Sequence, residues 1–113
     1  MMLDSEQIIA LLKDIYLSWL DSLDKQALRR KVIVKANLDQ PCIIRYIHYH
    51  QRPKQYCFSL QQYINKLGFE NYLGVKLQGT GGEFYILKLY PLLNKPGFLD
   101  EVYTLWKILK QGS

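Results

Sequence analysis

The segment of residues 45–56 (RYIHYHQRPKQY) has the composition best suited to binding chemistry. It interleaves cationic side chains with phenol rings, namely Arg45, Arg52 and Lys54 with Tyr46, Tyr49 and Tyr56. Cations neutralise phosphate groups and planar rings stack on unpaired bases, which are the two requirements of a nucleic-acid surface. Arg and Tyr are also the favoured residues of protein interfaces. Composition alone therefore leaves both kinds of ligand open.

Metal and cofactor chemistry has little support in the sequence. His48 and His50 lie two residues apart on a predicted strand, in step with Cys42, and Cys57 follows nearby. Zinc sites usually carry closely spaced ligand pairs in both halves of the site, and only one half exists here. We predict no metal site and no cofactor.

Catalytic motifs are also missing from the sequence. The carboxylates Asp21, Asp24 and Glu83 are scattered, and no nucleophile is paired with a base. The glycine cluster at 79–82 (GTGG) precedes a predicted strand rather than a helix N-terminus. It is therefore expected to be a hairpin turn and not a phosphate-binding loop. We predict that the protein is not an enzyme.

The overall composition is that of a globular chain. The 113 residues include 49% hydrophobic and 22% charged residues, which suits a single domain, 1–113, with its own core. The two cysteines form no disulfide framework, and no apolar run reaches the roughly 18 residues that span a bilayer. Because the N-terminus also lacks a secretory signal, we expect a cytoplasmic protein with no membrane partner.

The net charge of +5 is unevenly distributed. Residues 1–24 carry one Lys against five acidic residues, whereas residues 25–54 carry eight Lys or Arg against one Asp. The remaining 59 residues carry six Lys against four acidic residues. A basic block of this kind attracts either a phosphate backbone or an acidic protein surface, and its sign alone does not choose between them.

The elements that must position these residues follow from periodicity and turn signals. Asp4 and Gln7 predict a capping box, Ser59 and Gln62 predict another, and Gly68 marks a helix end. The expected order is a helix at 5–23, strands at 31–38 and 42–49, a basic loop at 51–55, a helix at 60–67, strands at 72–78 and 83–90, and a helix at 98–110. We predict one small α+β domain, α-β-β-α-β-β-α, whose four-stranded, mainly antiparallel sheet has helices packed on it.

Two predicted elements carry more apolar surface than one buried face requires. The helix at 5–23 is apolar well beyond a single stripe, so its own domain or another chain must cover it. In the strand at 83–90, Phe84, Ile86 and Tyr90 lie on one face, and the other face of the same strand is also apolar. For the strand at 42–49, alternation does not show which face points inward.

The element order, together with residues 16–24 (YLSWLDSLD), resembles the core of LAGLIDADG homing endonucleases. That family packs its motif helices through small residues and places a metal-binding acid at the helix end. Here Trp19 and Leu20 stand where small residues belong, and the segment has no glycine. The resemblance therefore implies an order of elements and not a nuclease activity.

The sequence favours a non-enzymatic protein-binding module, such as an adaptor, assembly factor or regulatory subunit. Its partner would be a protein, a peptide segment that pairs with a sheet edge, or a second copy of the chain. The residues expected to contact it are Arg45, Tyr46, Tyr49 and Arg52 on a polar surface, and Phe84, Ile86 and Tyr90 on an apolar one. The alternative is nucleic-acid binding by the basic block, with Arg29, Arg30, Lys31, Lys35 and Arg52 on phosphates and Tyr46 or Tyr49 stacking on bases.

Overall fold

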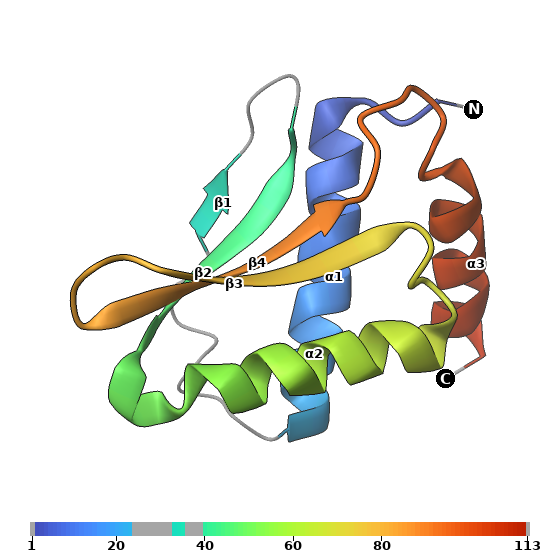
Figure 1. Cartoon of the computed structure of the whole chain (residues 1–113). Coiled ribbons are helices and arrows are strands. Elements are labelled where there is room, and N and C mark those ends of the chain that lie inside the picture. The colour runs from blue at the N-terminus through green and yellow to red at the C-terminus, as the bar shows by residue number, and fades with distance from the viewer. Residues whose placement is uncertain (1, 24–32, 36–39, 113) are drawn as a thin grey trace.

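The computed structural model describes residues 2–23, the backbone of 33–35, and residues 40–112. Along the chain it contains α1 (Ser5–Leu23), β1 (Ile33–Lys35), β2 (Cys42–His48), the 3-10 turn η2 (Tyr49–Gln51), α2 (Pro53–Leu67), β3 (Leu73–Gly79), β4 (Phe84–Pro91) and α3 (Asp100–Gln111). A small α+β domain with an antiparallel sheet is thereby confirmed (Figure 1). The rest of the strand predicted at 31–38 lies outside the described residues.

The sheet has the order β1-β2-β4-β3, so β4 lies next to β2 and β3 forms an edge. β2 and β4 pair over six residues, from Ile43 opposite Leu89 to His48 opposite Phe84. The hairpin of β3 and β4 places Gly74 opposite Tyr90. Because side chains alternate across a strand, these pairings sort the described residues into two faces.

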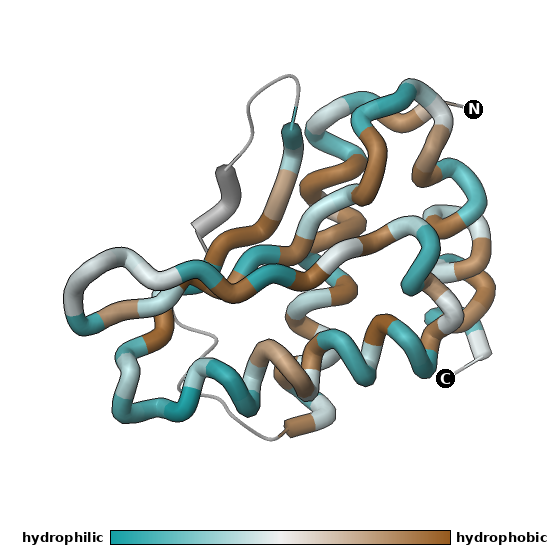
Figure 2. Tube along the Cα trace, in the orientation of Figure 1, coloured by the Kyte–Doolittle hydropathy of each residue, from teal (hydrophilic) through white to brown (hydrophobic). Residues whose placement is uncertain are grey.

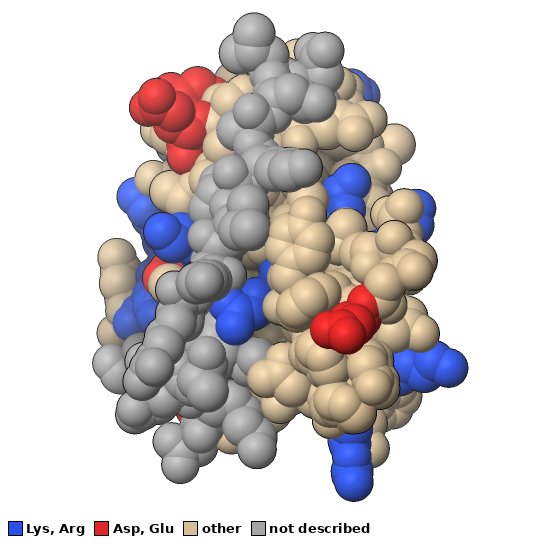
Figure 3. Space-filling model, turned by 90° about the vertical axis from the view of Figure 1, so that its left-hand side faces the viewer, with Lys and Arg blue, Asp and Glu red and all other residues tan. Residues whose placement is uncertain are grey.

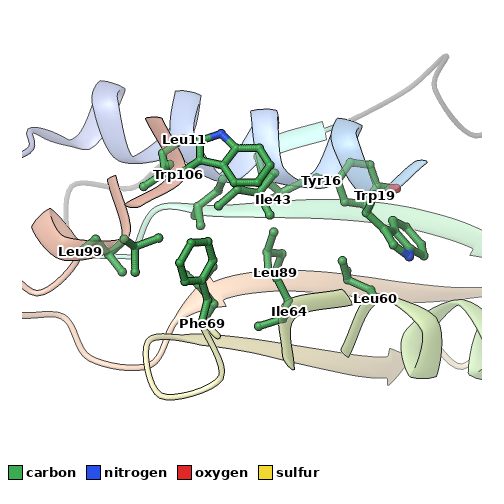
Figure 4. Close-up of a cluster of buried hydrophobic side chains, with 14 of the residues drawn as sticks. Leu11, Tyr16, Trp19, Ile43, Leu60, Ile64, Phe69, Leu89, Leu99 and Trp106 are labelled. Atoms are coloured by element: carbon green, nitrogen blue, oxygen red, sulfur yellow. The ribbon is translucent and has the colours of Figure 1, made fainter. Parts of the chain in front are cut away.

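One face of the sheet, the core face, is covered by the helices. Its buried side chains are Ile43, Ile47, Leu73, Leu87 and Leu89. Figure 4 shows two residues of this layer, Ile43 and Leu89, among core side chains of all three helices and of the segments that follow α2 and precede α3. Figure 2 shows the same division along the chain, with hydrophobic positions dense on α1 and alternating with polar ones on the strands.

The unusually apolar helix α1 is covered by its own domain. Asp14 Oδ2 accepts a hydrogen bond of 2.7 Å from Nε1 of Trp106 on α3. On the α2 side, Trp19 Nε1 donates to Ser59 Oγ at 3.0 Å. No large hydrophobic side chain of α1 is exposed. Most of the apolar surface predicted for this helix is therefore used inside the fold, and Ile8, Ile9, Leu17 and Leu23 are partly buried against the same core.

Several local predictions are confirmed. Asp4 and Gln7 form the reciprocal capping box, with each backbone N–H donating to the other side chain at 2.9 and 2.8 Å. Gly68 ends α2 in the left-handed region, with φ 81°. The GTGG cluster connects the antiparallel strands β3 and β4 as a hairpin turn.

The predicted start of the second helix is wrong. Residues 53–55 are not a loop, because α2 begins at Pro53, whose fixed φ suits the first helical position. Arg52 turns the chain there with a left-handed φ of 58°. Ser59 therefore lies inside the helix, where its hydroxyl binds the Trp19 indole instead of capping. Phe58, one residue before Ser59, is on the outside of α2 and 67% exposed.

The buried phenol of Tyr16 predicts a specific alkaline sensitivity. Its hydroxyl has no hydrogen-bond partner among the described residues. Burial raises the pKa of Tyr16 to about 12, although the positive charge of Arg45 acts in the opposite direction. The unfolded chain ionises this phenol near its ordinary pKa of 10.0. The contribution of the Tyr16 phenol to the free energy of unfolding is therefore fully present below pH 10, and it is lost as the pH rises from about 10 to 12.

We expect Tyr16→Phe to remove this part of the pH dependence. The unfolding free energies of both proteins are measured by urea denaturation from about pH 8 to 11. Above pH 10 the value for the wild type should fall below that for the variant by about 1.4 kcal/mol per pH unit. Below pH 10 the variant should match or slightly exceed the wild type, because a buried hydroxyl without a partner is removed. Parallel curves across the whole range would contradict this assignment.

Candidate functional site

The second face of the sheet, which we call the outer face, carries the candidate site. By strand alternation and register it is formed by Tyr46 and His48 of β2, Lys76 and Gln78 of β3, and Phe84, Ile86, Lys88 and Tyr90 of β4. The helices of the described chain pack on the opposite face. Ile44 and Cys42 share the outer face but are buried. The accessible part therefore runs over β4, β3 and the end of β2.

Two lysines lie directly opposite each other on this face. Lys76 of β3 pairs with Lys88 of β4 across the antiparallel ladder. Like charges in such cross-strand positions repel and cost stability. Neither β2, β3 nor β4 contains an acidic residue. The pair is thus a concentration of positive charge for which the strands themselves supply no counter-charge.

Aromatic side chains occupy the same surface. Tyr46 is 39% exposed and lies opposite Ile86, while Phe84 is 44% exposed and lies opposite His48. The rings of His48 and Phe84 meet edge to face at 5.3 Å between centroids. Tyr49, in η2 just beyond β2, stacks on His48 at 4.7 Å. The outer face therefore combines exposed planar rings with the lysine pair.

Tyr90 lies flat across the neighbouring strand because Gly74 leaves room for it. A Cβ atom at Gly74 would stand only 2.6 Å from Cζ of the Tyr90 ring and 2.9 Å from Cδ2 of Leu92. The ammonium of Lys88 lies 5.5 Å from the centre of the same ring. Cation and ring are thereby held side by side on the outer face.

We expect Gly74→Ala to push the Tyr90 ring out of this position. The loss of the ring packing should cost about 1 kcal/mol of unfolding free energy, the scale of a cross-strand pair, measured by urea denaturation. Gly79→Ala is the matched control in the same strand, because a Cβ there meets only Tyr85, at an ordinary 3.8 Å. Equal effects of the two substitutions would contradict the role assigned to Gly74.

The residues predicted to contact a partner do not form one surface. Phe84, Ile86, Tyr90 and Tyr46 share the outer face, whereas Arg45 lies on the core face and is only 8% exposed. The positive charge of Arg45 acts to lower the pKa of the buried Tyr16 phenol, against the larger effect of burial. Tyr49 and Arg52 are exposed in and after η2. Arg45 is therefore excluded from any contact surface on the outer face.

The basic block of the alternative hypothesis is only partly described. Arg29, Arg30 and Lys31 lie outside the described residues, and of Lys35 the backbone pairs with Cys42 in the ladder of β1 and β2. Figure 3 shows Lys and Arg side chains in separate places on both sides of one face of the molecule, and acidic side chains in separate places between them.

The two histidines and the two cysteines lie in different parts of the fold. His48 and His50 stack at 4.7 Å, and the Nδ1 of His48 accepts the backbone N–H of His50. Cys42 is buried at the other end of β2, and Cys57 lies on α2, where burial raises the pKa of its thiol. His48 also approaches Glu83, with 3.5 Å between Nε2 and Oε2.

Lys76 and Lys88 were not predicted as site residues from the sequence. They lie in a part of the chain where opposite charges nearly balance, so a charge count along the sequence does not single them out. Their strand alternation places each on a face, but only the hairpin register places them opposite each other.

Comparisons of the chain with protein-family models, curated proteins and solved structures found no match.

Proposed function

We propose that the protein binds nucleic acid through the outer face of its sheet. The single observation that carries this proposal is the cross-strand pair of Lys76 and Lys88 among the rings of Tyr46, Phe84 and Tyr90. A polyanion relieves the repulsion between the two ammonium groups. A nucleic acid is the polyanion that also brings flat rings to stack on the aromatic side chains.

The proposed binding mode divides the work between two kinds of side chain. Lys76 and Lys88 neutralise phosphates, which gives affinity but no sequence preference. Tyr46 and Phe84 are the most accessible rings of the outer face, and they supply stacking surfaces for bases. No acidic side chain of β2, β3 or β4 opposes the approach of a phosphate chain.

The test is a titration of the full chain with fluorescein-labelled oligonucleotides at two salt concentrations, followed by anisotropy. We expect binding at low salt that weakens as salt increases, because phosphate contacts release counterions. An acidic peptide of matched length and charge is the comparison ligand. Equal binding of the peptide, or no salt-sensitive binding of any oligonucleotide, would overturn the proposal.

Protein binding remains the second candidate, and it is favoured by a feature of α3. Leu105, Ile108 and Leu109 form an exposed apolar row at helical spacing, with Lys107 and Lys110 beside it. Such a row is suited to a second copy of the chain. Sedimentation over a hundredfold range of protein concentration tests this candidate, and a monomer throughout would count against it.

A further inference from the structure

The outer face ends in a hollow of about 570 Å³. It is bounded by the start of β2, the end of β4, the segment 92–97 that follows β4, and the residues around the start of α1. Lys76, Lys88 and Tyr90 line it as well as belonging to the outer face. The hollow is therefore continuous with the proposed binding surface. Its volume is within the range of about 300–1,000 Å³ that small-molecule sites occupy.

Three lysines line the hollow. Lys95, from the segment after β4, adds a third ammonium group to those of Lys76 and Lys88. Two carboxylates also line the hollow, and both already accept backbone hydrogen bonds. Asp4 Oδ1 accepts from the N–H of Gln7 at 2.8 Å, and Asp100 Oδ1 accepts from the N–H of Leu3 at 3.4 Å. The lysines thus outnumber the carboxylates, and two of them belong to the sheet itself.

Apolar residues also line the hollow. Leu92 and Leu93 are among them although both side chains are exposed, and Pro41 and Pro96 line the hollow as well. Exposed leucines around a hollow offer surface that an apolar or flat ring can cover. The ligand chemistry indicated by the whole site is an anionic group attached to a flat, weakly polar ring.

We infer that this hollow receives one unpaired nucleotide of the bound strand, with its phosphate on the lysines and its base against Leu92 and Leu93. The inference rests on the proposed function and gives it a substrate class, single-stranded nucleic acid. A base enters such a hollow only outside a duplex stack, since unstacking and unpairing a base costs a few kcal/mol. A single strand therefore binds more tightly than a duplex of the same length.

The experiment compares two variants of the hollow with two matched controls. Leu93→Trp fills space beside the apolar residues of the hollow, and Phe58→Trp enlarges an exposed hydrophobic side chain elsewhere, on α2. Lys95→Gln removes a cation from the hollow, and Lys66→Gln removes an exposed one from α2. Anisotropy titrations use a labelled single-stranded dodecamer and the matching duplex. Unchanged thermal midpoints verify that each variant is folded.

We expect Leu93→Trp to weaken single-strand binding by about tenfold and Lys95→Gln by about fivefold, and both controls to change it by less than about twofold. Adenosine monophosphate at millimolar concentration should shift the methyl NMR signals of Leu92 and Leu93 in the wild type, whereas in Leu93→Trp the Leu92 signal should stay in place. If the wild type binds neither oligonucleotide, the proposed function itself fails. If it binds but hollow variants match their controls, or duplex and single strand bind equally, only the inference about the hollow is overturned.

Discussion

Trp19→Ala should destabilise the protein strongly, by about 3–5 kcal/mol of unfolding free energy. The indole is 1% exposed and contacts side chains of both α1 and α2. Its ring packs on Tyr16 at 5.5 Å and on Tyr56 at 6.2 Å between centroids. Its N–H donates to Ser59 Oγ. Removing it opens a large cavity between α1 and α2 and leaves the Ser59 hydroxyl without this donor.

The urea midpoint measures this effect. Because a loss of this size approaches the total stability of many domains, Trp19→Phe provides a milder variant, expected to lose about 1–2 kcal/mol through the hydrogen bond and part of the packing. Phe58→Ala is the control, since that exposed aromatic residue of α2 should cost less than about 0.5 kcal/mol. A Trp19→Ala protein as stable as the Phe58 control would show that the packing described for α1 and α2 is wrong.

Replacing both Lys76 and Lys88 by Gln should produce the largest loss of nucleic-acid affinity, about 10- to 30-fold at low salt. Each phosphate contact contributes about 1 kcal/mol, where 1.4 kcal/mol corresponds to tenfold. The slope of log affinity against log salt should also decrease by about 1.4, since each contact with a single strand contributes about 0.7. The double variant should be no less stable than the wild type, because the cross-strand repulsion is removed.

A charge-matched control decides whether the location of the lysines matters. Lys13→Gln together with Lys66→Gln removes the same charge from exposed positions on α1 and α2, the helices that pack on the opposite face of the sheet. This control should retain affinity to within about threefold and keep most of the salt slope. Equal losses in both double variants would mean that the oligonucleotide responds to net charge, and the outer face would then lose its assigned role.

Most helices and turns were predictable because their signals are local. The Asp4–Gln7 box and Gly68 each act within one helical turn, and the structure has both as expected. The start of α2 was predicted wrongly because that prediction also used a local signal. A Ser-x-x-Gln pattern at Ser59 is a valid local cap, but the hydroxyl forms a tertiary hydrogen bond with Trp19 instead. Local preference gave way to a contact 40 residues away in sequence.

The candidate site depended on information that is not local. The alternation of side chains in β2 is the same whichever face is buried. The sequence therefore did not show that Tyr46 lies on the surface and that Arg45 is buried. Packing of the helices on one side decided this, since Ile43 and Ile47 join the core together with the buried Arg45.

By itself, the sequence determined an α+β domain with an apolar first helix, a hairpin turn at 79–82 and a basic, tyrosine-rich composition. These features follow from periodicity, caps and turn residues, which act between near neighbours. Only the tertiary structure brought Lys76 opposite Lys88, laid Tyr90 across Gly74 and opened the hollow at the end of the sheet. Strand register and helix coverage join residues that are distant in sequence, and a one-residue change in register would exchange the two faces of the sheet.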